Sequence, residues 1–294
     1  MIMRTRKRTV TFRSLPLPRV VGKAGSHILD DYRSRRAAVR AVYCRGVTPP
    51  TFTAVFNFRD LGGHATGDGR TVRPGRLFRS DSLHRISAGD VEQLASLGVR
   101  TVLDLRRPTE IALVGRVPVE LGLDYHNVYP VHREWDPAVY DEAAGAHRFL
   151  ADRYRDMAEE GRAGLGEALR MVADARYAPL VMHCMAGKDR TGVLAALTLS
   201  LLGVPDEAVA ADYALSELTQ GRLSQRLRED GVALDVPMHF MVCPPQAMLL
   251  FLTELRTRYG SVLAYAEAAG VTDAHVAALR GHLLQDSAAE PLLP

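Results

Sequence analysis

The chain has 294 residues, of which 47% are hydrophobic, and its formal net charge at pH 7 is +3. A chain of this length can bury a substantial core, and the lack of any run of about 18 uncharged apolar residues excludes a typical transmembrane helix. The cysteines, Cys44, Cys184 and Cys243, are odd in number and have no metal-ligand spacing. We therefore expect a reducing, cytoplasmic setting, without a disulfide framework or a metal site.

The positive charge is concentrated in the first 50 residues. Residues 1–50 contain 12 basic and 2 acidic side chains, whereas residues 51–294 contain 25 basic and 32 acidic ones. The basic segment lacks the apolar core of a secretory signal, interleaved aromatic residues and any nucleic-acid-binding motif. We therefore interpret residues 1–50 as a solvated or partly disordered extension and expect no nucleic-acid partner. The two prolines of "GVTPPT" (46–51) then mark the start of a domain spanning 51–294.

Beyond this boundary the sequence pattern predicts a mixed α/β domain. The stretch "SAGDVEQLASLGV" (87–99) is typical of a helix, because Ser87 and Asp90 form a capping-box pattern and Gly98 is a stop signal. The next stretch, "VRTVLDL" (99–105), predicts a buried strand, and "DYHNVYPV" (124–131) predicts a weaker one. Residues 137–175 are rich in helix-forming side chains and predict mainly helix.

The stretch "PLVMHCMAGKDRTGVLAALTLSLLG" (179–203) combines a strand, a charged loop and a helix. "PLVMH" is a short apolar strand, and "TGVLAALTLSLLG" is apolar nearly all round, which is typical of a buried helix that stops at Gly203. A strand-to-helix loop points several backbone N–H groups at one spot, and the helix adds roughly half a positive charge there. The sequence therefore predicts an anion-binding loop with Cys184 at its base.

This placement gives the charged residues chemical roles. A helix N-terminus and nearby cations lower the pKa of a cysteine, so we expect Cys184 to be a thiolate. The guanidinium of Arg190 can offer a planar fork to two oxygens of a bound phosphate, and Lys188 adds a point charge. Cys243 and Cys44 carry no such pattern, and we interpret them as structural.

The neighbouring residues have supporting roles in the same loop. Gly187 permits a close backbone approach or an unusual dihedral angle. The Thr191 hydroxyl can serve the sulfur when the thiolate leaves, and His183 can brace the loop from behind. A nucleotide-binding P-loop is excluded because Met182 and Asp189 stand where that motif requires glycine and serine or threonine. A rhodanese-type sulfurtransferase shares only the chemistry of the loop.

Residues 183–192, H-C-x-x-G-K-D-R-T-G, resemble the H-C-x5-R-[ST] signature of cysteine-dependent protein tyrosine and dual-specificity phosphatases. The Lys and Asp inside the loop are similar to those of the bacterial PtpB type. The resemblance spans residues 52–284, and its further blocks are "NFRDLGG" (57–63), "VRPGRLFRSDSL" (72–83), "GVRTVLDLRRPTE" (98–110), "DYALSE" (212–217) and "YGSVLAYAEAAGV" (259–271).

The resemblance implies a cysteine-phosphatase fold, in which helices flank a central, mostly parallel sheet. It implies that the protein hydrolyses phosphotyrosine; some relatives also hydrolyse phosphoserine, phosphothreonine and phosphoinositides. The reaction it implies passes through a cysteinyl-phosphate intermediate and needs no metal or cofactor. The expected partners are phosphorylated proteins or phosphoinositides, and no stable membrane insertion is expected. The sequence does not predict an oligomeric state. The substrate-binding residues that it implies are Met185, Ala186, Gly187, Lys188, Thr191 and Gly192. The alternative is a catalytically weak phosphate- or phosphoinositide-binding module, against which Cys184, Asp189 and Arg190 argue together.

The general acid has two candidates. In the PtpB type an aspartate directly precedes the loop arginine, which corresponds to Asp189. Many other relatives place it on a separate loop, which leaves Asp104 as a competitor; the alternative role for Asp104 is to hold an arginine. Arg59 and Asp60 are expected to support the loop, although Gly62 and Gly63 alone would explain that segment as a turn.

Two features bear on specificity. Lys188 also resembles a lysine in the H-C-K-A-G-K-x-R loop of the phosphatase and tensin homologue, a lipid phosphatase, but Met185 replaces the first lysine of that loop. The resemblance therefore favours phosphotyrosine over phosphoinositides. The helical stretches 137–175 and 205–228 form either a lid over the site, as in the PtpB type, or ordinary covering helices.

Overall fold

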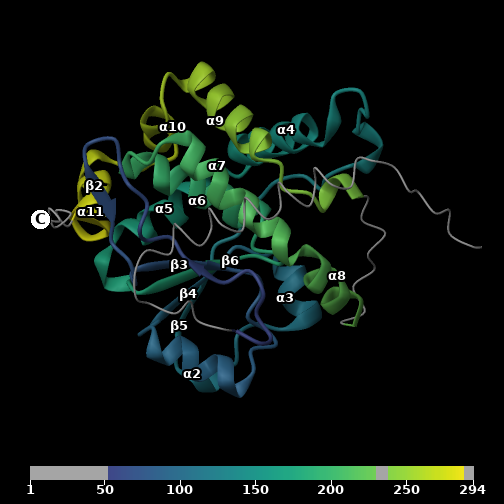
Figure 1. Ribbon diagram of the computed structural model, residues 1–294, viewed down its shortest axis with the longest axis vertical. Coiled ribbons are helices and arrows are strands. Elements are labelled where there is room, and N and C mark those ends of the chain that lie inside the picture. Colours follow the sequence, from purple (N-terminus) through teal and green to yellow (C-terminus); the bar gives the residue numbers. More distant parts are fainter. Residues whose placement is uncertain (1–51, 230–237, 288–294) are drawn as a thin grey trace, which may run out of the picture. The chain divides into compact units, whose positions relative to one another are not determined.

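The centre of the fold is a five-stranded sheet that is parallel except at one edge (Figure 1). The computed structural model describes residues 52–229 and 238–287, which lie in the unit Val42–Pro294. The strand order is β1-β3-β6-β4-β5, and only β1 pairs antiparallel. These strands are β1 (Arg59–Asp60), β3 (Leu77–Ser80), β4 (Thr101–Asp104), β5 (Asp124–Asn127) and β6 (Leu180–His183). The proposed extension, residues 1–50, lies outside the described residues, and its boundary stays a prediction.

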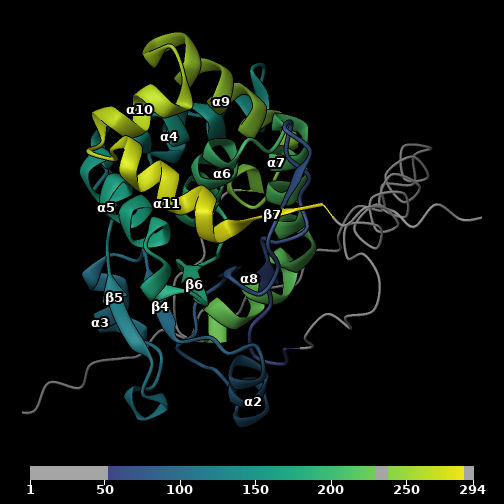
Figure 2. The same cartoon turned by 90° about the vertical axis from the view of Figure 1, so that its left-hand side faces the viewer.

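Helices cover both faces of this sheet (Figure 2). On one face lies α2 (Ala88–Ser96), whose Leu94 packs with Phe78, Val102 and Val181. The other face carries the larger core. It is built with α4 (Gly145–Glu160), α5 (Arg162–Ala173), α6 (Asp189–Leu202), α7 (Asp206–Ala214), α9 (Pro245–Tyr259), α10 (Val262–Ala268) and α11 (Asp273–Leu283).

Strand β6 is buried on both of its faces. Its Val181 belongs to the smaller cluster, whereas Leu180 and Met182 belong to the larger one. Successive side chains of a strand point to opposite faces, so a central parallel strand that is covered on both faces is mostly apolar. This confirms the buried strand predicted from "PLVMH".

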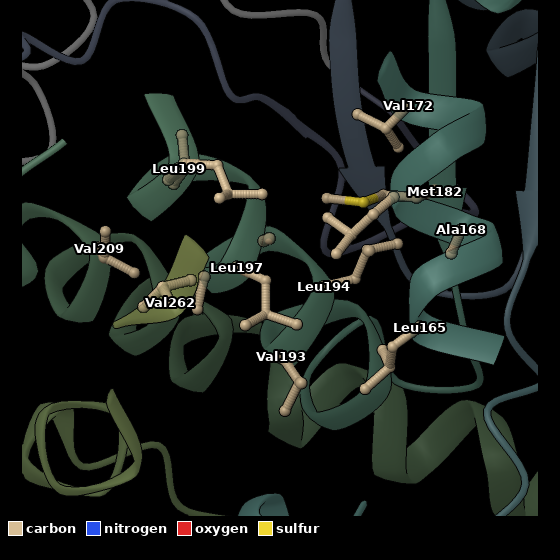
Figure 3. Packing of buried hydrophobic residues seen from close by; sticks show 14 of the residues in the cluster. Leu165, Ala168, Val172, Met182, Val193, Leu194, Leu197, Leu199, Val209 and Val262 are labelled. Atoms are coloured by element: carbon tan, nitrogen blue, oxygen red, sulfur yellow. The ribbon is translucent and has the colours of Figure 1, made fainter. Parts of the chain in front are cut away.

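Helix α6 runs through the larger core. Figure 3 shows Val193, Leu194, Leu197 and Leu199 of α6 between side chains of α5 and β6 on one side and Val209 and Val262 on the other. Gly203, with φ +87°, ends the helix as predicted. The helix begins at Asp189, two residues before the predicted start, because an acidic side chain in the first turn is favoured by the helix dipole.

The other predicted elements are present with shifted bounds. Ser87 caps α2 with a capping box to Asp90. Residues 137–175 form a 3-10 turn (Pro137–Val139) followed by α4 and α5, which separate at Gly161. A second sheet pairs β2 (Arg70–Val72) with β7 (Leu284–Asp286). Of the helices in the described ranges, none is long and apolar enough to cross a membrane.

Three further elements follow β4 and α7 in the chain. Helix α3 (Pro108–Val114) comes after β4, and a 3-10 turn (Leu215–Thr219) and α8 (Gln220–Glu229) come after α7. A further 3-10 turn (Met238–Phe240) precedes α9. Helices α4, α5 and α7 contribute buried side chains to the larger core and pack against α6 or α9, which favours the interpretation as covering helices. Their additional role as a lid stays a prediction.

Candidate active site

The predicted anion-binding loop lies where the strand and helix assignments place it. Cys184 directly follows β6 and is 2% exposed, and the loop joins β6 to the start of α6. In the parallel register His183 lies opposite Ser80 of β3 and Asp104 of β4, so the carboxyl ends of all three strands surround the loop. The N–H of Ser82 donates to the Met185 carbonyl at 3.1 Å. The loop is therefore fixed by its neighbouring strand as well as by its own helix.

Gly187 packs against the end of β3 without room for a side chain. Its φ is +64°, and a Cβ atom at this position would lie 2.2 Å from the carbonyl oxygen of Ser80. L-residues rarely adopt this dihedral angle, and no carbon can approach an oxygen so closely. Both reasons for a glycine that the sequence suggested therefore apply at this position.

Arg190 is held from the side by a carboxylate of α3. Its Nη1 and Nη2 donate to the two oxygens of Glu110 at 2.5 and 2.8 Å, and Nη1 also donates to the Leu105 carbonyl at 3.3 Å. Burial lowers the pKa of Arg190, but Glu110 and the charge of Cys184 outweigh it and raise that pKa above its ordinary value. A guanidinium has five N–H groups, so these bonds leave Nε–H and one Nη2–H side by side. This second fork has the geometry for two oxygens of a phosphate.

Asp189 contacts one side chain from α4 and the side chain of the residue before it. The hydroxyl of Tyr154, on α4, donates to Asp189 Oδ1 at 2.7 Å, and Lys188 Nζ lies 3.2 Å from the same oxygen. Lys188 is 1% exposed, and its ammonium also donates to the Phe240 carbonyl. The Tyr213 hydroxyl lies 2.6 Å from that of Tyr154. Asp189 is therefore part of a hydrogen-bonded chain that reaches α4, α7 and the turn before α9.

Asp104, the competing acid, is enclosed and paired. It contacts Arg106 through hydrogen bonds of 2.7 to 3.1 Å, and the side chains of both residues are 0% exposed. Burial would raise the pKa of Asp104, but His183 and Arg106 lower it to about 2. His183 Nδ1 lies 3.1 Å from the Cys184 carbonyl, and burial lowers the pKa of its imidazole. His183 thus contacts the loop from behind, with Asp104 on its other side.

A buried ion triad supports the loop from β1 and β3. Asp212 of α7 pairs with Arg59 at 2.7 Å and with Arg79 at 2.5 Å. Burial would raise the pKa of Asp212, but the charges of the two arginines hold it well below its usual range. Arg79 Nη2 donates to the Gly187 carbonyl at 2.8 Å, so the triad ends on the loop backbone. Arg59 acts on the loop through Asp212 and through Asn57, to whose Oδ1 its Nη1 donates at 2.5 Å, and among the described residues it makes no hydrogen bond to the loop itself.

The segment "NFRDLGG" lies beside the loop, but its aspartate faces elsewhere. Asn57 Nδ2 donates to the Ala186 carbonyl at 3.0 Å. Asp60 instead accepts from the N–H groups of Gly62 and Gly75 at 2.7 and 2.6 Å, and burial raises its pKa. Asp60 therefore holds a turn.

The remaining loop residues lie at the start of α6. Thr191 is fully buried, and within the described ranges its hydroxyl has no hydrogen-bond partner. Gly192 packs against the Tyr213 ring, which a Cβ atom would approach to 3.2 Å. Cys243 is fully buried, and burial raises the pKa of its thiol to about 12, so it remains protonated. No group of three or more His, Cys, Asp and Glu residues in the described part of the chain could hold a metal ion.

Comparison with known proteins identifies the family. A family model described as "Tyrosine phosphatase family" matches residues 50–285. The chain belongs to the tyrosine phosphatase family. It is 33% identical over 248 residues to a protein of Cupriavidus necator that carries a tyrosine-protein phosphatase name, covering 79% of this chain and 87% of the relative. It is 30% identical over 280 residues to the triple specificity protein phosphatase PtpB of Mycobacterium tuberculosis, covering 78% of this chain and 96% of that protein.

Solved phosphatase structures match this one weakly. The catalytic domain of the PP-IP phosphatase SIW14 from S. cerevisiae gives a TM-score of 0.31 at 15% identity, covering 73% of this chain and 96% of that one. TpbA from P. aeruginosa gives a TM-score of 0.25 at 18% identity, covering 62% and 90%. The relatives and the family model establish the activity: this chain is a protein tyrosine phosphatase, a phosphoric monoester hydrolase.

Several residues of this tyrosine phosphatase site were not anticipated from the sequence. They are Asn57, Glu110, Tyr154, Asp212 and Tyr213. Glu110 closes the quoted block "GVRTVLDLRRPTE", and Asp212 opens "DYALSE". For Glu110 and Asp212, the sequence contains one indication of a role in the site: each is a charged residue inside a block that resembles the family. Tyr154 and Tyr213 fall in helices where an aromatic side chain is ordinarily part of the core.

Proposed function

We propose that Cys184 is the nucleophile of this phosphatase and that Arg190 binds the transferred phosphoryl group. The observation that carries the proposal is the fixed guanidinium: Glu110 and Leu105 take three of its N–H groups, and the remaining two face one way. A nucleophile at the base of a loop whose amides and arginine converge can attack phosphorus while charge on the equatorial oxygens is stabilised.

The reaction proceeds in two displacements. The Cys184 sulfur forms a bond to phosphorus as the bond to the tyrosine oxygen breaks, which gives a cysteinyl-phosphate and a phenol. Water then attacks the phosphorus, and the thiolate leaves with inorganic phosphate as the second product. The loop amides and Arg190 hold the three equatorial oxygens in both steps, and the Thr191 hydroxyl serves the leaving sulfur.

Asp189 is the general acid in this proposal. Its side chain is 23% exposed and belongs to the residue next to Arg190, whereas Asp104 is enclosed and engaged by Arg106. A general acid must come within hydrogen-bond reach of the oxygen that it protonates. This requirement supports Asp189 as the acid. Asp104 then has a positioning role, and so do His183, Arg59 and the turn held by Asp60.

Phosphotyrosine in a protein is the substrate that the site supports best. The lysine that would suit a multiply phosphorylated inositol ring, Lys188, already has the Phe240 carbonyl and Asp189 as partners. Binding a second phosphate there would require Lys188 to exchange a buried contact, which costs free energy. Phosphoinositides, and the phosphoserine and phosphothreonine suggested by the triple specificity of PtpB, are therefore secondary substrates.

The test is replacement of the nucleophile. Cys184→Ser should abolish hydrolysis of p-nitrophenyl phosphate without unfolding the protein, because a serine hydroxyl is a poor nucleophile without a base. Cys243→Ser is the matched control and should retain turnover. The rate of the unmodified enzyme should be the same with and without EDTA. Wild-type turnover by Cys184→Ser, or loss of activity with EDTA, would refute the mechanism.

A further inference from the structure

The carboxylate of Asp189 is hydrogen-bonded asymmetrically. The Tyr154 hydroxyl donates to Oδ1 at 2.7 Å, and the Lys188 ammonium forms an ion pair with the same oxygen at 3.2 Å. Among the described residues no side chain or backbone group bonds to Oδ2. An oxygen that accepts a hydrogen bond and also faces an ammonium group is the less favourable of the two oxygens to carry a proton of its own. When the carboxyl is neutral, its proton therefore resides on Oδ2.

The direction of the tyrosine hydrogen bonds follows from counting hydrogens. A phenol has one hydrogen, and Tyr154 uses it toward Asp189, so the Tyr213 hydroxyl must donate to the Tyr154 oxygen at 2.6 Å. Burial, followed by the charge of Asp189, raises the pKa of Tyr154 well above its ordinary value, and burial raises the pKa of Tyr213 as well. Both phenols remain protonated at working pH, and both are constant donors.

The backbone positions of these residues make the contact a rigid one. Tyr154 and Tyr213 are 0% exposed, and they come from α4 and α7, which both pack against α9. Their rings meet edge to face with centroids 5.8 Å apart. Asp189 is the first residue of α6. The packing of α4, α6 and α7 thus determines where Oδ1 lies, and it thereby fixes the orientation of the Asp189 carboxyl group.

We propose that Tyr154, oriented by Tyr213, is a positioning residue that keeps the transferable proton of Asp189 on Oδ2. The inference rests on the proposed role of Asp189 as the general acid. In the first displacement the sulfur–phosphorus bond forms, the phosphorus–oxygen bond breaks, and the Oδ2 proton passes to the departing oxygen. Asp189 is left as a carboxylate. The Tyr154 hydrogen bond strengthens as this negative charge develops, so it lowers the barrier of proton transfer.

The experiment compares two substrates in a set of variants. Tyr154→Phe should lower kcat/KM for phenyl phosphate, a poor leaving group, by about ten- to a hundredfold, because a hydrogen bond to a developing charge is lost. The loss for an activated aryl phosphate such as p-nitrophenyl phosphate should be several times smaller. A merely structural defect would reduce both rates equally. Tyr213→Phe should show the same pattern at smaller amplitude.

A matched control is Tyr265 of α10, whose hydroxyl contacts the same helix, α4. The Tyr265 hydroxyl, also buried, donates to the Ala158 carbonyl of α4 at 2.8 Å and does not contact Asp189. Tyr265→Phe removes an equivalent buried hydroxyl and should leave kcat/KM unchanged for both substrates. Equal losses in Tyr154→Phe and Tyr265→Phe would overturn the inference.

Two further variants separate this inference from the function on which it rests. If Asp189→Asn slows phenyl phosphate far more than p-nitrophenyl phosphate, Asp189 is the acid; an even loss rejects that role and the inference with it. If Asp189→Asn shows the expected dependence but Tyr154→Phe does not, the acid stands and the positioning role fails. The double variant should be no slower than Asp189→Asn alone on phenyl phosphate, because both changes act through one proton. Multiplying losses would also reject the positioning role.

Discussion

Replacing Gly187 by alanine tests how tightly the phosphate-binding loop is built against β3. A Cβ atom at position 187 would lie 2.2 Å from the Ser80 carbonyl oxygen and 2.7 Å from the Asp81 nitrogen. These are backbone atoms, and the loop is also tied down by the Arg79 contact to the Gly187 carbonyl. Neither side can yield by a simple side-chain rotation, so the backbone of the loop must move.

The expected cost has two parts. An L-residue at φ +64° loses about 1 to 2 kcal/mol, and forcing a methyl group into a packed site costs about 1 to 3 kcal/mol more. Together they give about 2 to 5 kcal/mol, which corresponds to a fall in Tm of roughly 4 to 20 °C for a domain of this size. A displacement of about 1 Å in a catalytic loop also costs roughly a hundredfold in rate.

The measurement is thermal unfolding and p-nitrophenyl phosphate turnover of Gly187→Ala beside Gly69→Ala. Gly69 has a similar φ, +83°, but nothing lies within 4 Å of its Cβ position. The control therefore carries the cost of the dihedral angle without the steric overlap, and it should keep full activity. The reasoning is wrong if the two variants unfold at the same temperature, or if Gly187→Ala retains wild-type turnover.

Two other predictions concern carboxylates. Glu110→Gln should lower kcat by about ten- to a hundredfold, because the charge that orients the loop arginine is lost. The control is Glu134→Gln: the Glu134 side chain is 86% exposed in its ion pair with Arg107, so kcat should change less than twofold. Similar kcat values for the two variants would contradict this prediction. Burial raises the pKa of Asp81 to about 6, so the folded state binds this proton more tightly than the unfolded chain. Stability should therefore fall as the pH rises from about 4 through about 6, by roughly 3 kcal/mol, and Asp81→Asn should remove this slope. Urea unfolding of the wild type and of Asp81→Asn at about pH 4 and pH 7 measures this change in stability. If the difference in unfolding free energy between the two proteins is the same at both pH values, the prediction is wrong.

Local patterns carried most of the fold and the central part of the site. The Ser87 and Asp90 capping box, Gly203 and the apolar run of β6 each act over a few residues, so their interpretation needed no tertiary knowledge. The position of Cys184 followed directly, because a short loop between a buried strand and a buried helix lies beside the N–H groups of the helix N-terminus.

The contacts that orient the site residues could not be predicted from local sequence patterns. Glu110 and Arg190 are separated by 80 residues and Tyr154 and Asp189 by 35, and each pairing depends on how whole helices cross. Asp212 gives no local sign that it lies between two buried arginines. The first turn of α6 was misjudged for a related reason: Asp189 and Arg190 look like loop residues until the helix dipole and their partners are known.

The pairing of β2 with β7 constrains how the chain acquires its structure. Val72 lies opposite Leu284, so one of the earliest strands of the domain completes its hydrogen bonds with the last strand among the described residues. Contacts between such distant residues form slowly, because closing a long loop costs entropy before any contact compensates for it. During synthesis, every residue from Asn57 to Asp212 that supports the phosphate-binding loop leaves the ribosome before this partner strand exists. A nascent chain therefore passes through a stage in which β2 has an unpaired edge, and an unpaired strand edge favours misassociation.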